Sequence, residues 1–155
     1  MRYLKLITAL AMLCVAYAGI GSASAEDYGT KDQAVAMVKR AIARVNEVGL
    51  DVAKLEFMDR NGKFVDRDLY IIVVDMAGIR VAHGQNPKLV GKTFVDAVDV
   101  NGKEYGKDVM RIAGAPGTGW VAYVFKDPIT GKVLPKEVYI EKAGDYVYVA
   151  GVYTR

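Results

Sequence analysis

Residues 68–75 read Asp-Leu-Tyr-Ile-Ile-Val-Val-Asp, an unbroken apolar and β-branched run between two aspartates. A strand with one face in water alternates apolar and polar residues, and this run does not. It therefore predicts a strand that is buried on both faces, in a sheet that other elements cover from both sides.

The rest of the sheet is predicted from the segments on either side of a long connector. Residues 79–83 alternate and follow the turn Met-Ala-Gly, which predicts a hairpin with the central strand. Residues 120–126, 133–141 and 146–154 predict three more strands, because the segments between them contain turn residues such as proline and glycine. Together these segments predict a five-stranded antiparallel sheet.

Residues 30–48 predict a long amphipathic helix that covers one face of the sheet. Thr30 or Asp32 can cap its first turn, and Gly49 ends it. Its apolar residues recur at spacings of three and four: Ala34, Val35, Met37, Val38, Ala41, Ile42, Val45 and Val48.

The connector between the two groups of strands spans residues 84–119 and is rich in glycine, asparagine and aspartate. Connectors of this length inside a compact domain usually carry function or structure of their own. A helix is predicted within it at residues 107–113, and another short helix at residues 51–60. The fold class is therefore α+β, with a five-stranded antiparallel sheet and a long N-terminal helix.

The first 25 residues have the pattern of a secretory signal peptide. Two basic residues precede an apolar run over about residues 6–20, and Ala-Ser-Ala at residues 23–25 suits signal peptidase. The run is shorter than the roughly 20 residues that span a bilayer, which favours cleavage over an uncleaved anchor. We predict a signal peptide at residues 1–25 and one exported domain at residues 26–155, with anchoring in the inner membrane as the alternative.

Removal of this segment changes both the cysteine content and the net charge of the protein. It contains the only cysteine, Cys14, so the exported domain has no disulfide, which favours a bacterial periplasm. It also holds two of the 21 basic residues, Arg2 and Lys5, and none of the 18 acidic residues. The exported domain therefore has 19 basic and 18 acidic residues. A net charge this small gives no support for nucleic acid or an anionic membrane as the main partner.

Motifs for catalysis and metal binding are sparse. Residues 26–155 contain one histidine and no nucleophile elbow, Walker loop or dinucleotide motif. The segment around Asp99 lacks the donor spacing of an EF-hand loop, so no metal and no cofactor are predicted. An enzyme that pairs His83 with a carboxylate such as Asp75 remains a minor alternative to a binding protein.

The hairpin over residues 117–140 concentrates aromatic and cationic side chains, including the only tryptophan. Alternation places Trp120 on one face of its strand and Tyr123 on the other. Together with Lys136 they offer indole, hydroxyl and ammonium donors between apolar walls, a set that suits a small anion such as a carboxylate. Plain sheet packing is the alternative, because tyrosine-rich strands and solvated lysines are common.

Read in order, the motifs of this chain resemble those of extracellular Cache domains. Residues 68–94 combine a tyrosine-led strand, a turn with glycine, a strand that ends in Ala-His, then Asn-Pro and Leu-Val-Gly-Lys. Residues 117–153 continue with Gly-Trp-Val-Ala-Tyr, a proline-containing hairpin, Lys-Glu-Val-Tyr and a closing Gly-Val-Tyr. The resemblance is to the single Cache type and covers about residues 30–153.

This resemblance implies a PAS-like sheet and the sensing of small molecules, often short-chain carboxylates, at bacterial cell surfaces. By position in the motifs it implies six ligand contacts: Tyr70, His83, Trp120, Tyr123, Lys136 and Tyr139. His83 and Lys136 would face anionic oxygen, and a protonated imidazole can donate from either nitrogen. Tyr123 and Tyr139 would hydrogen-bond, and Trp120 would form a wall. Lys136 and Tyr139 fall on opposite faces of an ideal strand, so a bulge or a shift at the start of the strand would be needed to bring both to one cavity.

The chain departs from the family pattern in two places. Gly84 stands where the family commonly has proline, which predicts a looser loop. The usual receptor continues into a transmembrane helix and a signalling module, whereas this chain ends at Arg155. We expect a non-enzymatic exported binding or sensing domain without its own output, which acts through a membrane receptor or a sensor kinase. A membrane-tethered sensory subunit and a homodimer through the N-terminal helix stay open.

Overall fold

The computed structural model describes residues 28–154, and the predicted signal peptide lies outside them. The helices are α1 (Lys31–Val48), α2 (Leu50–Met58), the 3-10 helix η2 (Pro87–Leu89) and α3 (Tyr105–Gly114). The strands are β1 (Val65–Asp66), β2 (Leu69–Tyr70), β3 (Ile72–Asp75), β4 (Arg80–His83), β5 (Thr118–Lys126), β6 (Val133–Ala143) and β7 (Tyr146–Tyr153). Within residues 28–154, no helix combines the length and the apolar character needed to cross a membrane.

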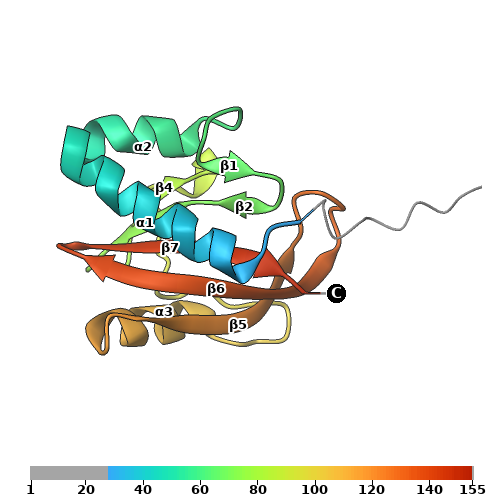
Figure 1. Ribbon diagram of the computed structural model, residues 1–155. Coiled ribbons are helices and arrows are strands. Elements are labelled where there is room, and N and C mark those ends of the chain that lie inside the picture. Colours follow the sequence, from blue (N-terminus) through green and yellow to red (C-terminus); the bar gives the residue numbers. More distant parts are fainter. Residues whose placement is uncertain (1–27, 155) are drawn as a thin grey trace, which may run out of the picture.

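Five strands form one antiparallel sheet in the order β4-β3-β7-β6-β5. Helix α3 belongs to the crossover that carries the chain from β4 at one edge to β5 at the other edge (Figure 1). The last three strands pair as a meander, as their turn sequences predict. The α+β fold with a five-stranded antiparallel sheet and a long N-terminal helix is confirmed.

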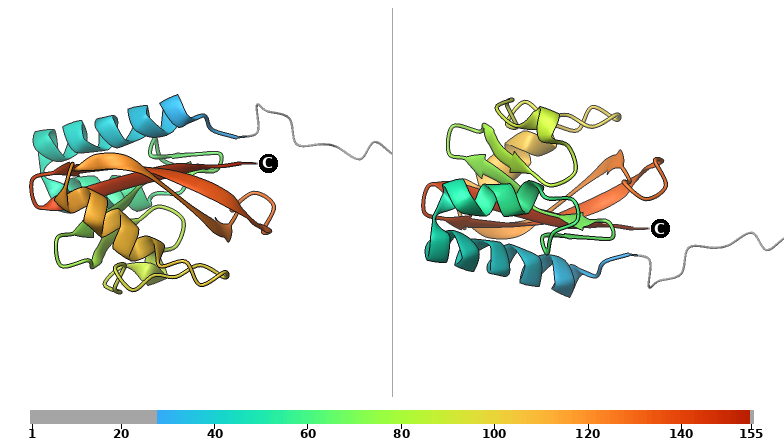
Figure 2. Two further views of the ribbon diagram at one scale, coloured as in Figure 1. Left: turned by 90° about the horizontal axis from the view of Figure 1, so that it is seen from below. Right: turned by 90° about the horizontal axis from the view of Figure 1, so that it is seen from above.

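Separate layers cover the two faces of the sheet. Helices α1 and α2 lie on one face, and α3 with the connector at residues 84–104 lies on the other (Figure 2). Side chains of β7 alternate between the layers, so Tyr148 packs toward α1 whereas Val147 and Val149 pack toward α3. The predicted burial of residues 68–75 from both sides is thereby confirmed.

Helix α1 begins with a capping box at the predicted residue. The Thr30 hydroxyl accepts from the backbone N–H of Gln33 at 3.2 Å, and the Gln33 side chain accepts from the backbone N–H of Thr30 at 2.9 Å. Gly49 ends the helix with a φ of 80°, a value that glycine adopts without strain. The buried stripe of α1 consists of Ala34, Met37, Val38 and Ala41.

The strand predicted at residues 68–75 is divided in two, so that prediction was wrong in detail. Strand β2 pairs with β1 in a separate two-stranded sheet, while β3 pairs with β4 and β7. The fully buried Asp68 carboxylate accepts from the backbone N–H groups of Gly29 at 2.6 Å and Tyr153 at 3.3 Å. These bonds fix the chain at the break and leave Tyr70 in the connector-side core.

Candidate functional site

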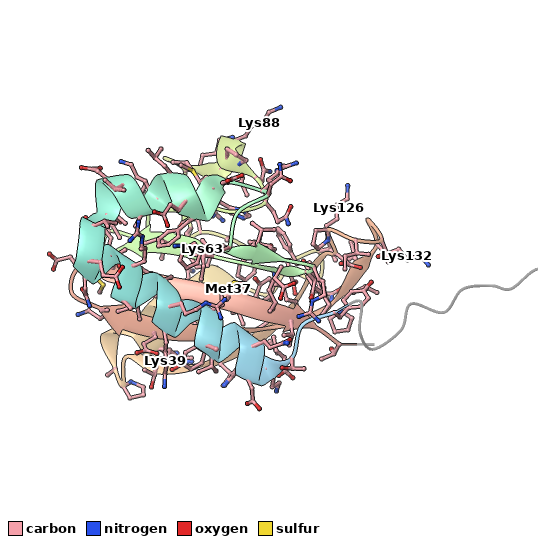
Figure 3. The ribbon with its side chains drawn as sticks, turned by 45° about the horizontal axis from the view of Figure 1, so that its top comes forward. Met37, Lys39, Lys63, Lys88, Lys126 and Lys132 are labelled. Carbon is pink, nitrogen blue, oxygen red and sulfur yellow. The ribbon has the colours of Figure 1, made fainter. Side chains whose placement is uncertain are left out.

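A cavity of about 600 Å³ opens on the connector side of the sheet. Its floor contains Tyr70 and His83, and the turn at residues 125–131 forms one wall. The opposite wall contains Gln85, Asn86 and Leu89. Figure 3 labels Lys126, which lines the cavity from the turn, and Lys88, which belongs to η2 beside the other wall. Two of the six predicted contacts, Tyr70 and His83, therefore line the cavity.

The floor is a stacked pair of rings. Tyr70 and His83 have centroids 5.2 Å apart and planes 27° apart, and both side chains are buried. Gly84 fits here because a Cβ would lie only 3.0 Å from the Tyr70 Cβ and from the Phe57 carbonyl oxygen. Its N–H donates to the Ile71 carbonyl at 2.9 Å, a bond that proline cannot make. The expectation of a loose loop at Gly84 is corrected, since the glycine is hydrogen-bonded and closely packed.

His83 is a neutral imidazole that carries its proton on Nε2. Its Nδ1 accepts from the backbone N–H groups of Asn86 at 3.0 Å and Gln85 at 3.3 Å, which leaves the hydrogen to the other nitrogen. Burial, followed by the charges of Lys136 and Arg80, lowers the pKa of His83 from 6.5 to about 3. With Nδ1 occupied by these backbone bonds, Nε2 is the ring nitrogen that can donate to a ligand.

Lys136 lies directly behind Tyr70. Its ammonium donates to the Tyr70 hydroxyl at 2.8 Å, and its nitrogen is 4.2 Å from the Tyr70 ring centroid and 4.7 Å from that of Tyr153. Because the Tyr70 oxygen accepts this bond, its own proton can be donated to another oxygen, either that of the neighbouring Tyr153 or that of a ligand. The side chain of Lys136 is only 2% exposed, so aromatic rings surround its charge instead of water.

Lys136 has no acidic partner in the part of the chain that the structure describes. No carboxylate of residues 28–154 forms an ion pair with Lys136 or with the second buried cation, Arg80. The buried acids Asp68 and Asp127 bond instead to backbone and hydroxyl groups. A buried charge without a counter-ion is costly, so this core carries positive charge that a bound anion would compensate.

A β-bulge brings Arg80 to the same face of the sheet as His83. The register between β3 and β4 shifts by one residue at Val81, whereas without the shift residues three apart would face opposite sides. Arg80 is 7% exposed, donates from Nη1 to the Thr93 carbonyl at 2.6 Å, and has a buried Nε with no hydrogen-bond partner. Sequence reasoning missed Arg80, because no local residue marks the bulge.

Tyr123 packs in the connector-side core with Tyr70 and does not line the cavity. Its ring stacks on that of Tyr105, with centroids 4.0 Å apart and planes 6° apart. Burial raises the pKa of both hydroxyls, that of Tyr123 well above its ordinary value, so both stay protonated. Tyr123 is the cross-strand partner of Lys136 and lies on the same face of the sheet.

Trp120 and Tyr139 lie on the opposite face of the sheet, where they pack with the core under α1. They are cross-strand partners whose ring centroids are 5.5 Å apart, and the Tyr139 hydroxyl donates to Glu141 at 2.8 Å. Their position along β5 and β6 alternates with that of Tyr123 and Lys136, and no register shift interrupts these strands. The structure therefore does not bring these two predicted contacts to the cavity.

The turn that forms one wall is closed by the fully buried Asp127. Its carboxylate accepts from the backbone N–H groups of Ile129 at 3.1 Å and Thr130 at 3.2 Å, and from the Thr130 hydroxyl at 2.6 Å. It also accepts from the Tyr28 hydroxyl at 3.0 Å. The wall is thereby attached to the segment immediately before α1.

The segment considered as a calcium loop is held by hydrogen bonds of its own. Both oxygens of the Asp99 carboxylate accept from backbone N–H groups, those of Asn101, Lys103 and Val124, at 2.9 to 3.0 Å. Within residues 28–154, no group of three His, Cys, Asp or Glu side chains is arranged to hold a metal ion. Asp99 therefore closes its turn and anchors it to β5.

The acid–base pair of the enzyme alternative does not form. Asp75 accepts from the backbone N–H of Ile79 at 2.8 Å in the hairpin turn. His83 pairs with Ile72 at the other end of β3, and residues three apart on that strand point to opposite faces. The imidazole therefore has no carboxylate from Asp75 to orient it.

Comparisons with known proteins identify the fold and the family of this chain. No curated protein matches the chain. A solved structure described as the periplasmic sensor domain of a chemotaxis protein is 27% identical, with a TM-score of 0.62 over 80% of this chain and 90% of that one. A methyl-accepting chemotaxis protein from Vibrio parahaemolyticus is 26% identical, with a TM-score of 0.61 over 79% of this chain and 82% of that one.

A third structure shares the fold at lower identity. It is described as the structural basis for carboxylic acid recognition by a Cache chemosensory domain, and it is 18% identical. Its TM-score is 0.63, over 80% of this chain and 88% of that one. The family model described as single Cache domain 2 matches residues 31–154. The chain therefore belongs to the single Cache domain 2 family, whose members are extracellular or periplasmic sensory domains that bind ligands.

Proposed function

We propose that this domain binds a small organic anion, of the short-chain carboxylate class, at the floor of the cavity. The Tyr70 hydroxyl and the Nε2–H group of His83 supply two neighbouring donors. Carboxylate oxygens only accept, so neutral donors in front of buried positive charge suit them. Lys136 supplies that charge directly behind Tyr70, and Arg80 adds to it from β4.

The observation that carries this proposal is the buried ammonium of Lys136. Its one hydrogen-bond acceptor among the described residues is the neutral Tyr70 hydroxyl, although an ammonium has three protons to donate. A ligand carboxylate would supply the counter-ion that this core lacks, whereas an uncharged ligand would leave the cost of burial in place. The relative described as recognising carboxylic acids supports the same ligand class.

We expect millimolar propionate, acetate, lactate or pyruvate to raise the melting temperature of the empty domain. A ligand at one hundred times its Kd stabilises the folded state by about 2.7 kcal/mol, which corresponds to roughly 5–10 °C for a domain of this size. A thermal-shift screen measures this, with propionamide and sodium chloride as controls for charge and ionic strength. No shift with any acid, or an equal shift with propionamide, would contradict the proposal.

We also propose that the domain is non-enzymatic and acts in the periplasm after removal of residues 1–25. The sensory role of its family supports this location, and the mass of the protein recovered from the periplasm distinguishes cleavage from a retained anchor. Its partner would be a membrane receptor or a sensor kinase, because relatives are sensor domains of chemotaxis proteins. A homodimer through α1 would pair a face that exposes Lys39 and Arg40, and equilibrium sedimentation tests it.

A further inference from the structure

The cavity is much larger than a short-chain acid requires. Its volume of about 600 Å³ falls within the range of roughly 300–1,000 Å³ that is typical of sites for drug-sized ligands. One water molecule accounts for about 30 Å³ of liquid, so acetate would leave room for many waters. The space above the floor can therefore hold a further part of the ligand.

Several polar groups on the walls are bonded within the walls. In the turn, the Asp127 carboxylate takes up the N–H group of Ile129 and the hydroxyl of Thr130. In the wall formed by η2, the Asn86 side chain accepts from the backbone N–H of Lys88 at 3.2 Å. The donors that remain on the walls include those of the half-buried Gln85 and the exposed Lys126, whereas the buried donors lie at the floor.

What the walls offer to a ligand is apolar surface. Phe125, Pro128 and Ile129 line the cavity from the turn, and Leu89 lines it from η2. Ile129 is 45% exposed, which places it among the large apolar side chains that the folded domain leaves in water. Contact of these apolar side chains with a hydrocarbon part of a ligand would be favourable, because it removes apolar surface from water.

We infer that the ligand is a monocarboxylate with a hydrocarbon tail of about four or more carbons. Its carboxylate would bind to Tyr70 and His83, and its tail would lie between Leu89 and Ile129. This inference rests on the proposed carboxylate function and extends it from short acids to longer ones.

Affinity should then rise with the length of the tail. Calorimetric titration of the whole domain with acetate, butyrate and hexanoate measures the trend, and each fully buried methylene contributes about fourfold in Kd. We expect hexanoate to bind at least 50-fold more tightly than acetate. Adipate matches hexanoate in length but ends in a second carboxylate, so it should bind at least tenfold more weakly than hexanoate. Equal binding of adipate would overturn the inference, because it would assign the far end of the cavity to a cation such as Lys126.

A pair of matched variants locates the tail. Ile129→Ser removes an exposed apolar side chain from the cavity, and we expect it to reduce the ratio of hexanoate to acetate affinity at least fivefold. Leu55→Ser is the control, since Leu55 is 64% exposed on α2, on the other side of the sheet. Circular dichroism confirms that both variants are folded.

The possible outcomes distinguish the apolar tail of the ligand from the proposed binding of a carboxylate. An unchanged ratio in Ile129→Ser, or equal affinity for acetate and hexanoate in the wild type, overturns the apolar tail and leaves carboxylate binding intact. Failure of every acid to bind removes the proposed function itself.

Discussion

Replacement of Lys136 by methionine should weaken carboxylate binding at least 30-fold while leaving the empty domain as stable as the wild type or more stable. The ammonium polarises the Tyr70 hydroxyl through a 2.8 Å hydrogen bond and supplies positive charge from a position that is 2% exposed. Loss of such a charge at a desolvated site costs about 2 kcal/mol or more in binding. Methionine fills similar volume without charge, and apolar replacements of buried charges are often neutral or stabilising.

Affinity for propionate and stability in urea, measured on the same variant, decide between a ligand site and a structural lysine. Lys142→Met is the control, because Lys142 is exposed on the same strand. Alanine would be a poor choice, since Lys136 is among the largest fully buried side chains and its removal would leave a cavity. Lower stability of Lys136→Met with unchanged propionate affinity would assign the residue to the core alone.

The stability of the empty domain should fall by about 2 kcal/mol between pH 7 and pH 5 because of His83 alone. Burial holds the pKa of His83 at about 3, compared with 6.5 for an unperturbed histidine. Below pH 6.5 the unfolded chain takes up a proton at this residue, while the folded domain does not until about pH 3. The free energy of unfolding therefore decreases by up to about 1.4 kcal/mol per pH unit across this window.

Urea unfolding at pH 7, 6 and 5 measures this dependence, and His83→Gln should flatten it. The chain has one histidine, so no other imidazole titrates in this range. Backbone N–H bonds, first that of Val124, hold the pKa of Asp99 below 3.8, and carboxylates of this kind lose their contribution at lower pH. Equal pH dependence in the wild type and His83→Gln would mean that the imidazole titrates as it does in water.

Burial patterns predicted the layers of this fold well. The run at residues 68–75 and the spacing within residues 30–48 reflect which faces are buried, and the long helix and the five-stranded sheet formed as expected. The break at Ile71 could not be predicted, because it accompanies bonds from Asp68 to backbone groups distant in the sequence. Local patterns carry no information about such a contact.

Only part of the candidate site was predicted, because local patterns also do not show which face of the sheet holds the cavity. Alternation separates Trp120 from Tyr123 in the sequence, and the structure shows that α1 covers the face of Trp120. Which face holds the cavity depends on the path of the connector, and local pattern does not determine that path. The aromatic hairpin therefore serves two purposes, packing beneath α1 and support of the site.

The two buried cations, Lys136 and Arg80, show most clearly what a local sequence pattern does not predict. Lysines are usually solvated, so full burial of Lys136 among aromatic rings was not expected from its residue type. Arg80 reaches the site only because the chain bulges at Val81, which an alternating strand pattern conceals. Both features depend on tertiary packing, which a local sequence pattern does not reveal.

The most direct test of carboxylate binding at the floor uses the single histidine as a probe. In untagged protein labelled with ¹⁵N-histidine, the ring signals at neutral pH should show a neutral imidazole protonated at Nε2. Addition of propionate or hexanoate should move the Nε2–H resonance downfield in a saturable way as the carboxylate accepts its hydrogen bond. Ring signals that stay fixed while calorimetry reports a bound acid would place the ligand elsewhere and contradict the site described for Tyr70, His83 and Lys136.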